Sequence, residues 1–206
     1  MRSVTRKTPV HDSNSKTADL VVTTLEHLLT EGENFTSLSI EQLAKKSGIA
    51  RATFYLHFRN KGELVGHLMK RVGREMRSAA KASMAELAQP ERKDFLRFMQ
   101  QAIEVNYQHR AAIRAVLETI SYDPAVAHIY AEFMQQMIGD TRHFIARLQA
   151  SGRARTDIAP DMAEVLTWMA ERCCHQMLSN GNSAAERGHL AEMLTHVVWS
   201  AIAAPA

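Results

Sequence analysis

The stretch that decides the fold is residues 39–63, which read SIEQLAKKSGIARATFYLHFRNKGE. Ser39 and Gln42 stand three residues apart, which is the spacing of a capping box and predicts that a helix begins there. Gly48 can adopt the positive φ that ends a helix and turns the chain. A second short helix is expected over residues 50–57. The stretch therefore predicts two short helices joined by a tight turn.

The second of these helices carries side chains whose chemistry suits DNA. Arg51 and Thr53 are expected to read bases, because arginine can hold guanine through two hydrogen bonds and threonine can contact a thymine methyl group. Tyr, His and Lys side chains can hold phosphates, and the start of a third helix, capped by Asn60, would suit another phosphate. We therefore expect a DNA-binding helix-turn-helix. Its candidate contacts are Ser39, Lys46, Arg51, Ala52, Thr53, Tyr55, His57 and Lys61.

The segment LSIEQLAKKSGIARATFYLHFRNKGEL, residues 38–64, resembles the signature of the TetR family of one-component transcriptional regulators. The Lys-x-x-Gly-Ile turn, the Thr-Phe-Tyr-x-His-Phe run and the Asn-Lys-x-Glu-Leu helix start carry the resemblance. Two positions depart from the pattern: Ala50 stands where a Ser cap is frequent, and Leu56 where a basic residue is frequent. The resemblance implies a repressor that binds a palindromic double-stranded DNA operator as a homodimer and is released by an effector.

Charge is unevenly distributed along the 206 residues, of which 46% are apolar. Residues 1–80 contain 13 Lys and Arg against 8 Asp and Glu, whereas residues 81–206 contain 12 against 14. A basic N-terminal part suits a nucleic-acid partner, although ordinary scatter of surface charge would give the same asymmetry. No apolar run approaches the ~18 residues that a membrane span needs, and the first residues lack the apolar core of a signal peptide. We expect a cytoplasmic protein.

The chain is predicted to contain three regions. Residues 1–15 are polar and basic, which predicts a flexible arm that is either solvated or placed in a DNA groove. Residues 16–62 are predicted to form a three-helix helix-turn-helix head. Residues 63–206 show only helical periodicity, which predicts a helical body for effector binding and dimerisation. The expected fold is all-α, with about nine helices.

Met and aromatic residues are concentrated in the predicted body. Ten of the 11 Met residues lie at or after Met69. Met side chains line adaptable apolar cavities, although ordinary core packing would give the same pattern. The resemblance implies an effector pocket, and the apolar stripes contain no charged residue, which predicts a small, apolar, uncharged or weakly polar effector. The predicted walls are Phe95, Phe98, Met99, Tyr130, Phe133, Met134, Met137, Trp168 and Met169.

Two helices with broad apolar faces are predicted over residues 161–180 and 184–202. They are expected to be antiparallel and to leave apolar surface for a second copy. In TetR-like proteins the last two helices form a four-helix bundle across the dimer twofold. The segments MAERCCHQM and HVVWSAI also resemble the ethionamide-repressor branch of that family. The predicted dimer interface is Met177, Leu190, Leu194, Val197 and Val198.

Neither catalytic nor metal chemistry is indicated by the sequence. No two of the ten His residues stand at i, i+4, and no Cys-x-x-Cys motif or nucleophile–base constellation accompanies them. Cys173 and Cys174 are adjacent in a predicted helix and are expected to be reduced, packed thiols. The competing classes are an enzyme built on a helical bundle and a helical adaptor that binds no DNA. The sequence favours a DNA-binding regulator with no cofactor, no metal and no catalytic residue.

Overall fold

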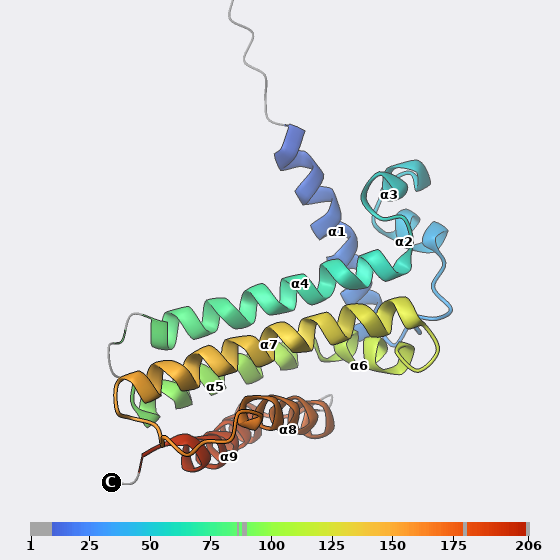
Figure 1. Cartoon of the computed structure of the whole chain (residues 1–206). Coiled ribbons are helices and arrows are strands. Elements are labelled where there is room, and N and C mark those ends of the chain that lie inside the picture. Colours follow the sequence, from blue (N-terminus) through green and yellow to red (C-terminus); the bar gives the residue numbers. More distant parts are fainter. Residues whose placement is uncertain (1–9, 86, 88–89, 179–180, 205–206) are drawn as a thin grey trace, which may run out of the picture. The chain divides into compact units, whose positions relative to one another are not determined.

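The structure of the chain is a computed structural model that describes residues 10–85, 87, 90–178 and 181–204. These residues form nine α-helices and no β-strand, and an isolated antiparallel bridge joins Ala154 to Ala203 (Figure 1). The all-α class predicted from helical periodicity is therefore confirmed. Among the helices of the described residues, none has both the length and the apolar character needed to cross a membrane.

The chain divides into two compact units whose boundary lies inside one helix, α4 (Lys61–Ala80). Residues up to Leu68 form the first unit, called the head below, and residues from Met69 onward form the second, called the body. The head contains α1 (Val10–Thr30), α2 (Ile40–Lys46), α3 (Arg51–His57) and the beginning of α4. The body contains the rest of α4, a π-helical turn (Lys81–Ala85), α5 (Arg92–Gln108), α6 (Arg110–Thr119), α7 (Pro124–Ala150), α8 (Met162–Met177) and α9 (Ala184–Ile202).

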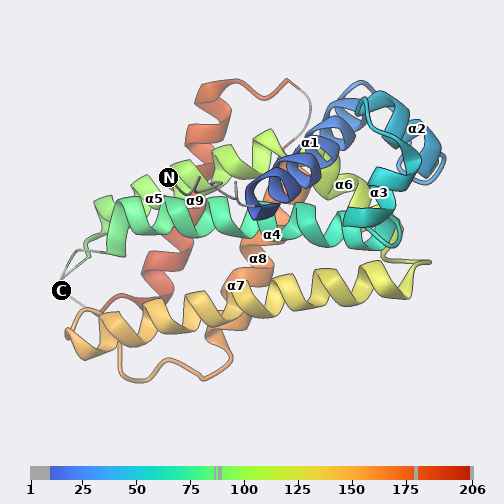
Figure 2. The ribbon, with the colours of Figure 1, turned by 90° about the horizontal axis from the view of Figure 1, so that it is seen from above.

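Local signals determine the helix ends of the head. The Ser39 hydroxyl accepts a hydrogen bond from the Gln42 amide at 3.2 Å, and the Gln42 side chain accepts one from the Ser39 amide at 2.7 Å, so the predicted capping box is confirmed. Gly48 has a φ of 68° and turns the chain between α2 and α3. The helices α1, α2 and α3 pack against one another (Figure 2). Fully buried side chains of the head include Leu25, Leu43, Phe54, Phe58 and Leu64.

Helix α1 begins earlier than the sequence predicted. It starts at Val10 and not near residue 16, so residues 10–15 of the expected flexible arm are helical. Extending an existing helix costs much less than starting one, and the packed turns from Ala18 to Leu29 supply the helix that is extended. The remaining part of the predicted arm, residues 1–9, lies outside the described residues.

The body is built around two long helices, α5 and α7. Helix α9 packs mainly against α5, α8 packs mainly against α7, and α6 contacts α5, α7 and α8. Figure 2 shows α8 and α9 crossing the long helices steeply and running in opposite directions. The last two helices are therefore antiparallel, as predicted, but the main packing partner of each is a long helix and not the other member of the pair.

Local signals set the ends of α7, whereas α8 ends earlier than the sequence predicted. The Asp123 carboxylate accepts a hydrogen bond from the Ala125 amide at 3.0 Å, and Pro124 occupies the first helical position, where proline is favoured. Gly152, with a φ of 69°, follows its last turn. Helix α8 ends at Met177, before the predicted end at residue 180, and residues 179–180 lie outside the described residues.

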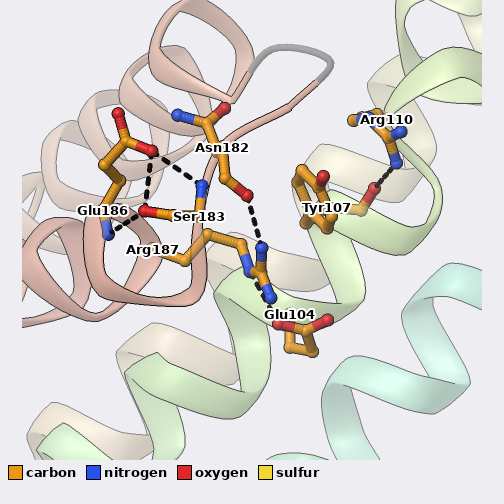
Figure 3. A network of polar contacts seen from close by, with 7 residues as sticks. All are labelled: Glu104, Tyr107, Arg110, Asn182, Ser183, Glu186 and Arg187. Atoms are coloured by element: carbon orange, nitrogen blue, oxygen red, sulfur yellow. Dashed lines mark hydrogen bonds and ion pairs between the residues drawn. The ribbon is translucent and has the colours of Figure 1, made fainter.

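A polar network fastens the start of α9 to α5 (Figure 3). Ser183 and Glu186 form a capping box that begins α9. One turn later, Arg187 donates to the Glu104 carboxylate at 2.9 Å, and its guanidinium lies 4.2 Å from the centre of the Tyr107 ring. Because Glu104 and Tyr107 are one turn apart on α5, this single arginine contacts both residues and adds a polar link to the apolar packing of the two helices.

Candidate functional site

The DNA-binding candidates of α3 lie on its outer face. Arg51, Ala52 and Tyr55 are exposed, and Thr53 and His57 are half-buried. The opposite face is closed, because Phe54 and Phe58 are fully buried with their ring centroids 5.2 Å apart. Helix α3 begins without a side-chain cap, since Ala50 has no hydroxyl group. The α3 backbone is thus held by its aromatic core and presents a polar surface on the other side.

Arg51 is held in place on this surface by two neighbours. Its guanidinium forms an ion pair with Glu41 of α2 and donates to the Tyr55 hydroxyl at 3.4 Å. It also lies 5.6 Å from the centre of the Tyr55 ring, within the range of a cation–π contact. The hydrogen bond to Tyr55 and the charge of Glu41 raise the pKa of Arg51. The guanidinium is therefore charged and oriented on the exposed face before any partner arrives.

The Lys61 side chain, which the sequence predicted to contact a phosphate, is bound to backbone carbonyls of the head. Its ammonium group donates to the carbonyls of Phe35, Thr36 and Leu38, at 2.6, 3.2 and 2.9 Å, and lies 4.5 Å from the centre of the Phe35 ring. An ammonium group has three donors, so these bonds engage all of them. Lys61 therefore fastens the segment between α1 and α2 to the start of α4, and the expected phosphate contact has no ammonium donor left for it.

Three further residues of the head flank α3. Ser39 is half-buried and its hydroxyl is used in the cap of α2, whereas Lys46 is exposed at the end of that helix. Asn60 accepts a hydrogen bond from the Glu63 amide at 3.0 Å, which confirms the predicted cap of α4. Glu63 in turn pairs with Arg59, and hydrogen bonds from the side chain and backbone of Arg59 lower the pKa of that carboxyl.

The body contains a cavity of about 540 Å³ between α4, α5, α7, α8 and α9. This volume lies within the range of small-molecule sites. Its wall is mostly apolar, and it includes six of the nine residues predicted to line an effector pocket. These six are Phe95, Phe98, Met99, Phe133, Met134 and Met137. The sequence did not predict the contributions of α4 and α9, which come from Met76, Arg77, Ala80, Val198 and Ile202.

The other three predicted pocket residues lie elsewhere. Trp168 is 37% exposed, with its ring 6.3 Å from that of Tyr130, and Met169 packs in the core beside the cavity without lining it. Tyr130 borders a second, smaller cavity of about 40 Å³. Helix α8 turns Leu166, Thr167, Ala170, Glu171 and Cys174 towards the large cavity. Its apolar residues extend over too wide an arc for periodicity alone to choose the inward face.

Glu171 is a charged residue in this wall, where the sequence predicted none. Both carboxylate oxygens are shielded from solvent and make no hydrogen bond to any described residue, and the same holds for the Tyr130 hydroxyl. Burial, together with the nearby Glu171 carboxylate, raises the pKa of Tyr130. Other charged residues at the cavity are Arg77, Lys81, Asp140 and Arg147. No periodic signal marks Glu171, because the pattern Glu171–His175 is typical of an ordinary surface pair on a helix.

Three of the five residues predicted for the dimer interface are buried inside a single chain. Leu190, Leu194 and Val198 belong to the core of the body with at most 6% exposure, so almost none of their surface is open to a second copy. Met177 and Val197 are each 46% exposed. The large apolar side chains exposed on these two helices are Val165, Trp168, Met177, Met193 and Val197. The interior of the body thus uses one face of α9, and the opposite face carries the exposed apolar groups.

The two cysteines form no disulfide, and burial raises the pKa of the Cys174 thiol to about 12. At neutral pH this thiol is protonated and weakly nucleophilic. Among the side chains that the structure describes, no group of three His, Cys, Asp or Glu residues is arranged to hold a metal ion.

Two family models match the chain. The model described as "Bacterial regulatory proteins, tetR family" matches residues 29–68, which include α2, α3 and the start of α4. The model described as "Transcriptional regulator EthR, C-terminal domain" matches residues 96–204 and thus more than half of the 206 residues. The helix-turn-helix and the cavity-containing body are therefore each similar to a defined domain.

Relatives and solved structures agree with these matches. The HTH-type transcriptional regulator EthR of Mycolicibacterium smegmatis is 28% identical over 191 residues, which cover 88% of this chain and 84% of that protein. EthR of Mycobacterium tuberculosis is 27% identical over 179 residues, covering 86% and 82%. Salmonella enterica GusR superposes with a TM-score of 0.75 at 16% identity, covering 91% of this chain and 95% of that chain. A TetR-family regulator from Mesorhizobium loti gives a TM-score of 0.71 at 18% identity, covering 93% and 98%.

Proposed function

Since the chain belongs to the TetR family of transcriptional regulators, we propose that it is a repressor that binds a palindromic operator as a dimer and is released by a small, predominantly apolar effector. Regulators of this family bind DNA and are not enzymes. One observation carries the proposal: the same chain combines an exposed polar face on α3 with a largely apolar cavity of about 540 Å³ in the body. The first feature suits an operator and the second a small molecule.

In this proposal the outer face of α3 enters the major groove. Arg51 and Thr53 read bases, because they lie on the solvent side of a helix whose other side is fixed by Phe54. Tyr55 and His57 hold phosphates from the same face, and Lys46 does so from the end of α2. The ion pair with Glu41 holds the Arg51 guanidinium on the exposed face until a DNA base replaces Glu41 as its partner.

A gel-shift titration tests this role, with the DNA upstream of the protein's own gene and a scrambled duplex of equal length. Arg51→Ala should weaken binding to the operator by about 1–3 kcal/mol and bring its affinity closer to that for scrambled DNA. Arg142→Ala, which removes the same charge from an exposed position of α7, is the matched control and should leave the preference unchanged. Equal operator preference in wild type and Arg51→Ala would contradict the base-reading role.

The cavity supports the effector part of the proposal, and α4 supplies the physical connection. This helix contributes Lys61 to the head and lines the cavity with Met76, Arg77 and Ala80. A ligand in the cavity can lower the affinity for DNA only to the extent that it binds more tightly to the conformation that does not bind DNA. Displacing the side chains of α4 is one way in which a ligand would create that preference.

Filling the cavity tests the effector role without any knowledge of the natural ligand. Ala102 lines the cavity on α5, so Ala102→Trp should occupy it and abolish the thermal shift given by apolar ligands. Ala131→Trp, at an exposed position of α7, is the matched control and should keep that shift. If a ligand that releases wild-type protein from DNA also releases Ala102→Trp at the same concentration, the cavity is not the effector site.

The dimer is proposed to form through the exposed apolar face of α8 and α9. Large exposed apolar groups on consecutive helices are typical of protein interfaces. A twofold dimer carries two heads, which explains why its operator should be palindromic.

Val197→Glu should shift the protein from dimer to monomer in sedimentation equilibrium. Leu20→Glu on α1 changes a residue with nearly the same exposure, 47% against 46%, and should stay dimeric. A monomeric wild type at micromolar concentration would contradict the proposed dimer.

A further inference from the structure

The buried carboxylate of Glu171 makes no hydrogen bond to the described residues, in a wall that is mostly apolar. Glu171 borders both the large cavity and the small one, and the two cavities also share Asn106, Phe133 and Cys174. Its two oxygens are closed off from solvent and accept no hydrogen bond from any described residue. A buried carboxylate is unfavourable unless it is paired and hydrogen-bonded. Among the described residues, no cationic side chain is hydrogen-bonded to this carboxylate.

Three arginine side chains that border the cavities are engaged with groups other than Glu171. Arg110 borders the small cavity, but its guanidinium donates to the Tyr107 carbonyl at 2.7 Å and lies 4.2 Å from the centre of the Tyr107 ring (Figure 3). At the large cavity, Arg77 pairs with Asp140 at 3.8 Å and Arg147 donates to a backbone carbonyl. These contacts direct the positive charges towards partners other than Glu171.

The Tyr130 hydroxyl borders the same small cavity as the Glu171 carboxylate. The Tyr130 ring is buried on α7, and its hydroxyl makes no hydrogen bond to the described residues. Burial and the charge of the Glu171 carboxylate raise the pKa of the Tyr130 phenol, which agrees with the two groups lying side by side at this cavity. Two carboxylate oxygens and one hydroxyl oxygen provide three acceptors, and a primary ammonium group has three N–H donors and no acceptor. The small cavity of about 40 Å³ beside them has room for a group of that size.

We propose that the cavity accepts an apolar amine, with the ammonium group bound by Glu171 and Tyr130 and the apolar remainder among Phe95, Phe98 and Met134. This inference rests on the proposed ligand-binding role of the cavity and specifies the class of ligand. A purely apolar ligand would cover the carboxylate without pairing it, which is unfavourable. A carboxylate ligand would add a second negative charge beside the first. An ammonium group satisfies the charge and the hydrogen bonds together.

Three probes with the same alkyl chain and different head groups test the inference: octylamine, octanol and octanoate. Isothermal titration of the full-length protein at neutral pH should show octylamine binding at least about tenfold more tightly than octanol, and octanoate binding most weakly. Equal affinities for octylamine and octanol, or tightest binding of octanoate, would overturn the inference and leave the cavity's ligand-binding role intact. Failure of both octylamine and octanol to bind would contradict that role itself.

Substitutions assign the amine preference to particular atoms. Glu171→Gln should reduce the octylamine preference to about twofold and leave octanol binding unchanged. Glu164→Gln removes the same charge from an exposed position of α8 and should keep the full preference. Tyr130→Phe removes only the hydroxyl and should weaken octylamine binding about threefold without affecting octanol, which keeps the test valid if Glu171→Gln lowers the melting temperature. An amine preference that survives both Glu171→Gln and Tyr130→Phe would overturn the inference.

Discussion

The Phe54–Phe58 contact of the head and the Phe95–Phe144 contact of the body place aromatic rings at similar separations, 5.2 and 5.4 Å between centroids, in different surroundings. Both rings of the head are fully buried. Both rings of the body border a cavity of about 540 Å³. A surface that reads DNA needs fixed side-chain positions, whereas a ligand site needs empty space. Phenylalanine serves both, because close packing fixes its ring in the head and the cavity leaves one side of its ring open in the body.

Truncating one ring in each region should give the largest difference. Phe54→Ala should destabilise the head by about 3–5 kcal/mol, because it opens a void in a closed core. Phe144→Ala should destabilise the body by less than half as much, because that ring already has empty space on one side. Both Trp residues, Trp168 and Trp199, lie in the body, so tryptophan fluorescence reports its unfolding, while circular dichroism reports both regions. Equal losses would show that the cavity wall is as tightly packed as the head.

Lys61→Ala should give the next largest effect and should act on the head alone. Removing the ammonium group leaves the Phe35 and Leu38 carbonyls without their donor, which should cost about 1–3 kcal/mol. The slope of DNA affinity against salt concentration should be unchanged, because no phosphate contact is lost. Lys46→Ala is the matched control: it should leave stability unchanged and lower the salt slope by about one unit. A lower salt slope for Lys61→Ala with normal stability would restore the phosphate role predicted from the sequence.

A smaller effect is expected at Glu75, whose carboxylate accepts hydrogen bonds from buried His109 at 2.9 Å and from Arg71 at 3.2 Å. Burial alone would raise the pKa of Glu75, but these two partners outweigh it and lower the pKa. A carboxyl whose pKa is lowered by folding stabilises the protein above its unfolded pKa of about 4.5, and that contribution is lost as the pH falls through the lower folded value. Glu75→Gln should therefore lower body stability by up to about 1 kcal/mol at neutral pH, and the loss should shrink below about pH 4.5.

The matched variant in the head is Glu63→Gln. Its carboxyl also has a lowered pKa, through Arg59, but this partner is 86% exposed, whereas the His109 partner of Glu75 is 6% exposed. Salt screens exposed pairs, so added salt should remove most of any effect of Glu63→Gln and little of the effect of Glu75→Gln. Denaturant titrations at two ionic strengths measure this contrast. An equal salt dependence of the two variants would remove this difference between head and body.

The smallest expected effect concerns the Glu41–Arg51 pair. Glu41→Gln should strengthen binding to all DNA by about two- to fivefold, because the guanidinium would no longer leave a carboxylate when it meets DNA. Glu104→Gln breaks the corresponding pair in the body, with Arg187, and should leave DNA affinity unchanged. Gel shifts with both variants measure this, and weaker binding by Glu41→Gln would mean that Glu41 orients Arg51 more than it competes for it.

Features of this protein that depend on neighbours within a few residues could be predicted from the sequence. The Ser39–Gln42 capping box, the turn at Gly48 and the Asn60 cap each depend on residues at most three positions away, and all three are present. The resemblance of residues 38–64 to the TetR family was likewise readable, because its motifs lie in one continuous segment.

Predictions that depended on which face of a helix another element covers were less successful. Helix α9 has apolar residues over so wide an arc that Val197 and Val198 looked equivalent, yet one is 46% exposed and the other 6%. Packing on α5 decides between them. The same argument applies to α8, where Trp168 was expected in the cavity and Glu171 was not. Periodicity shows that a helix has an apolar face but not where on a wide face its neighbour lies.

The sequence by itself thus determined the capping box of α2, the cap of α4 and the polar surface of α3, because each is set by backbone hydrogen bonds and side chains within a turn or two. Only the tertiary structure decided that Lys61 binds carbonyls 23 to 26 positions away, and that Leu194 belongs to the chain's own core. It alone also showed that Glu171 is buried without a partner. Burial and long-range hydrogen bonds depend on contacts between segments that are far apart in the sequence, and a local sequence pattern does not determine those contacts.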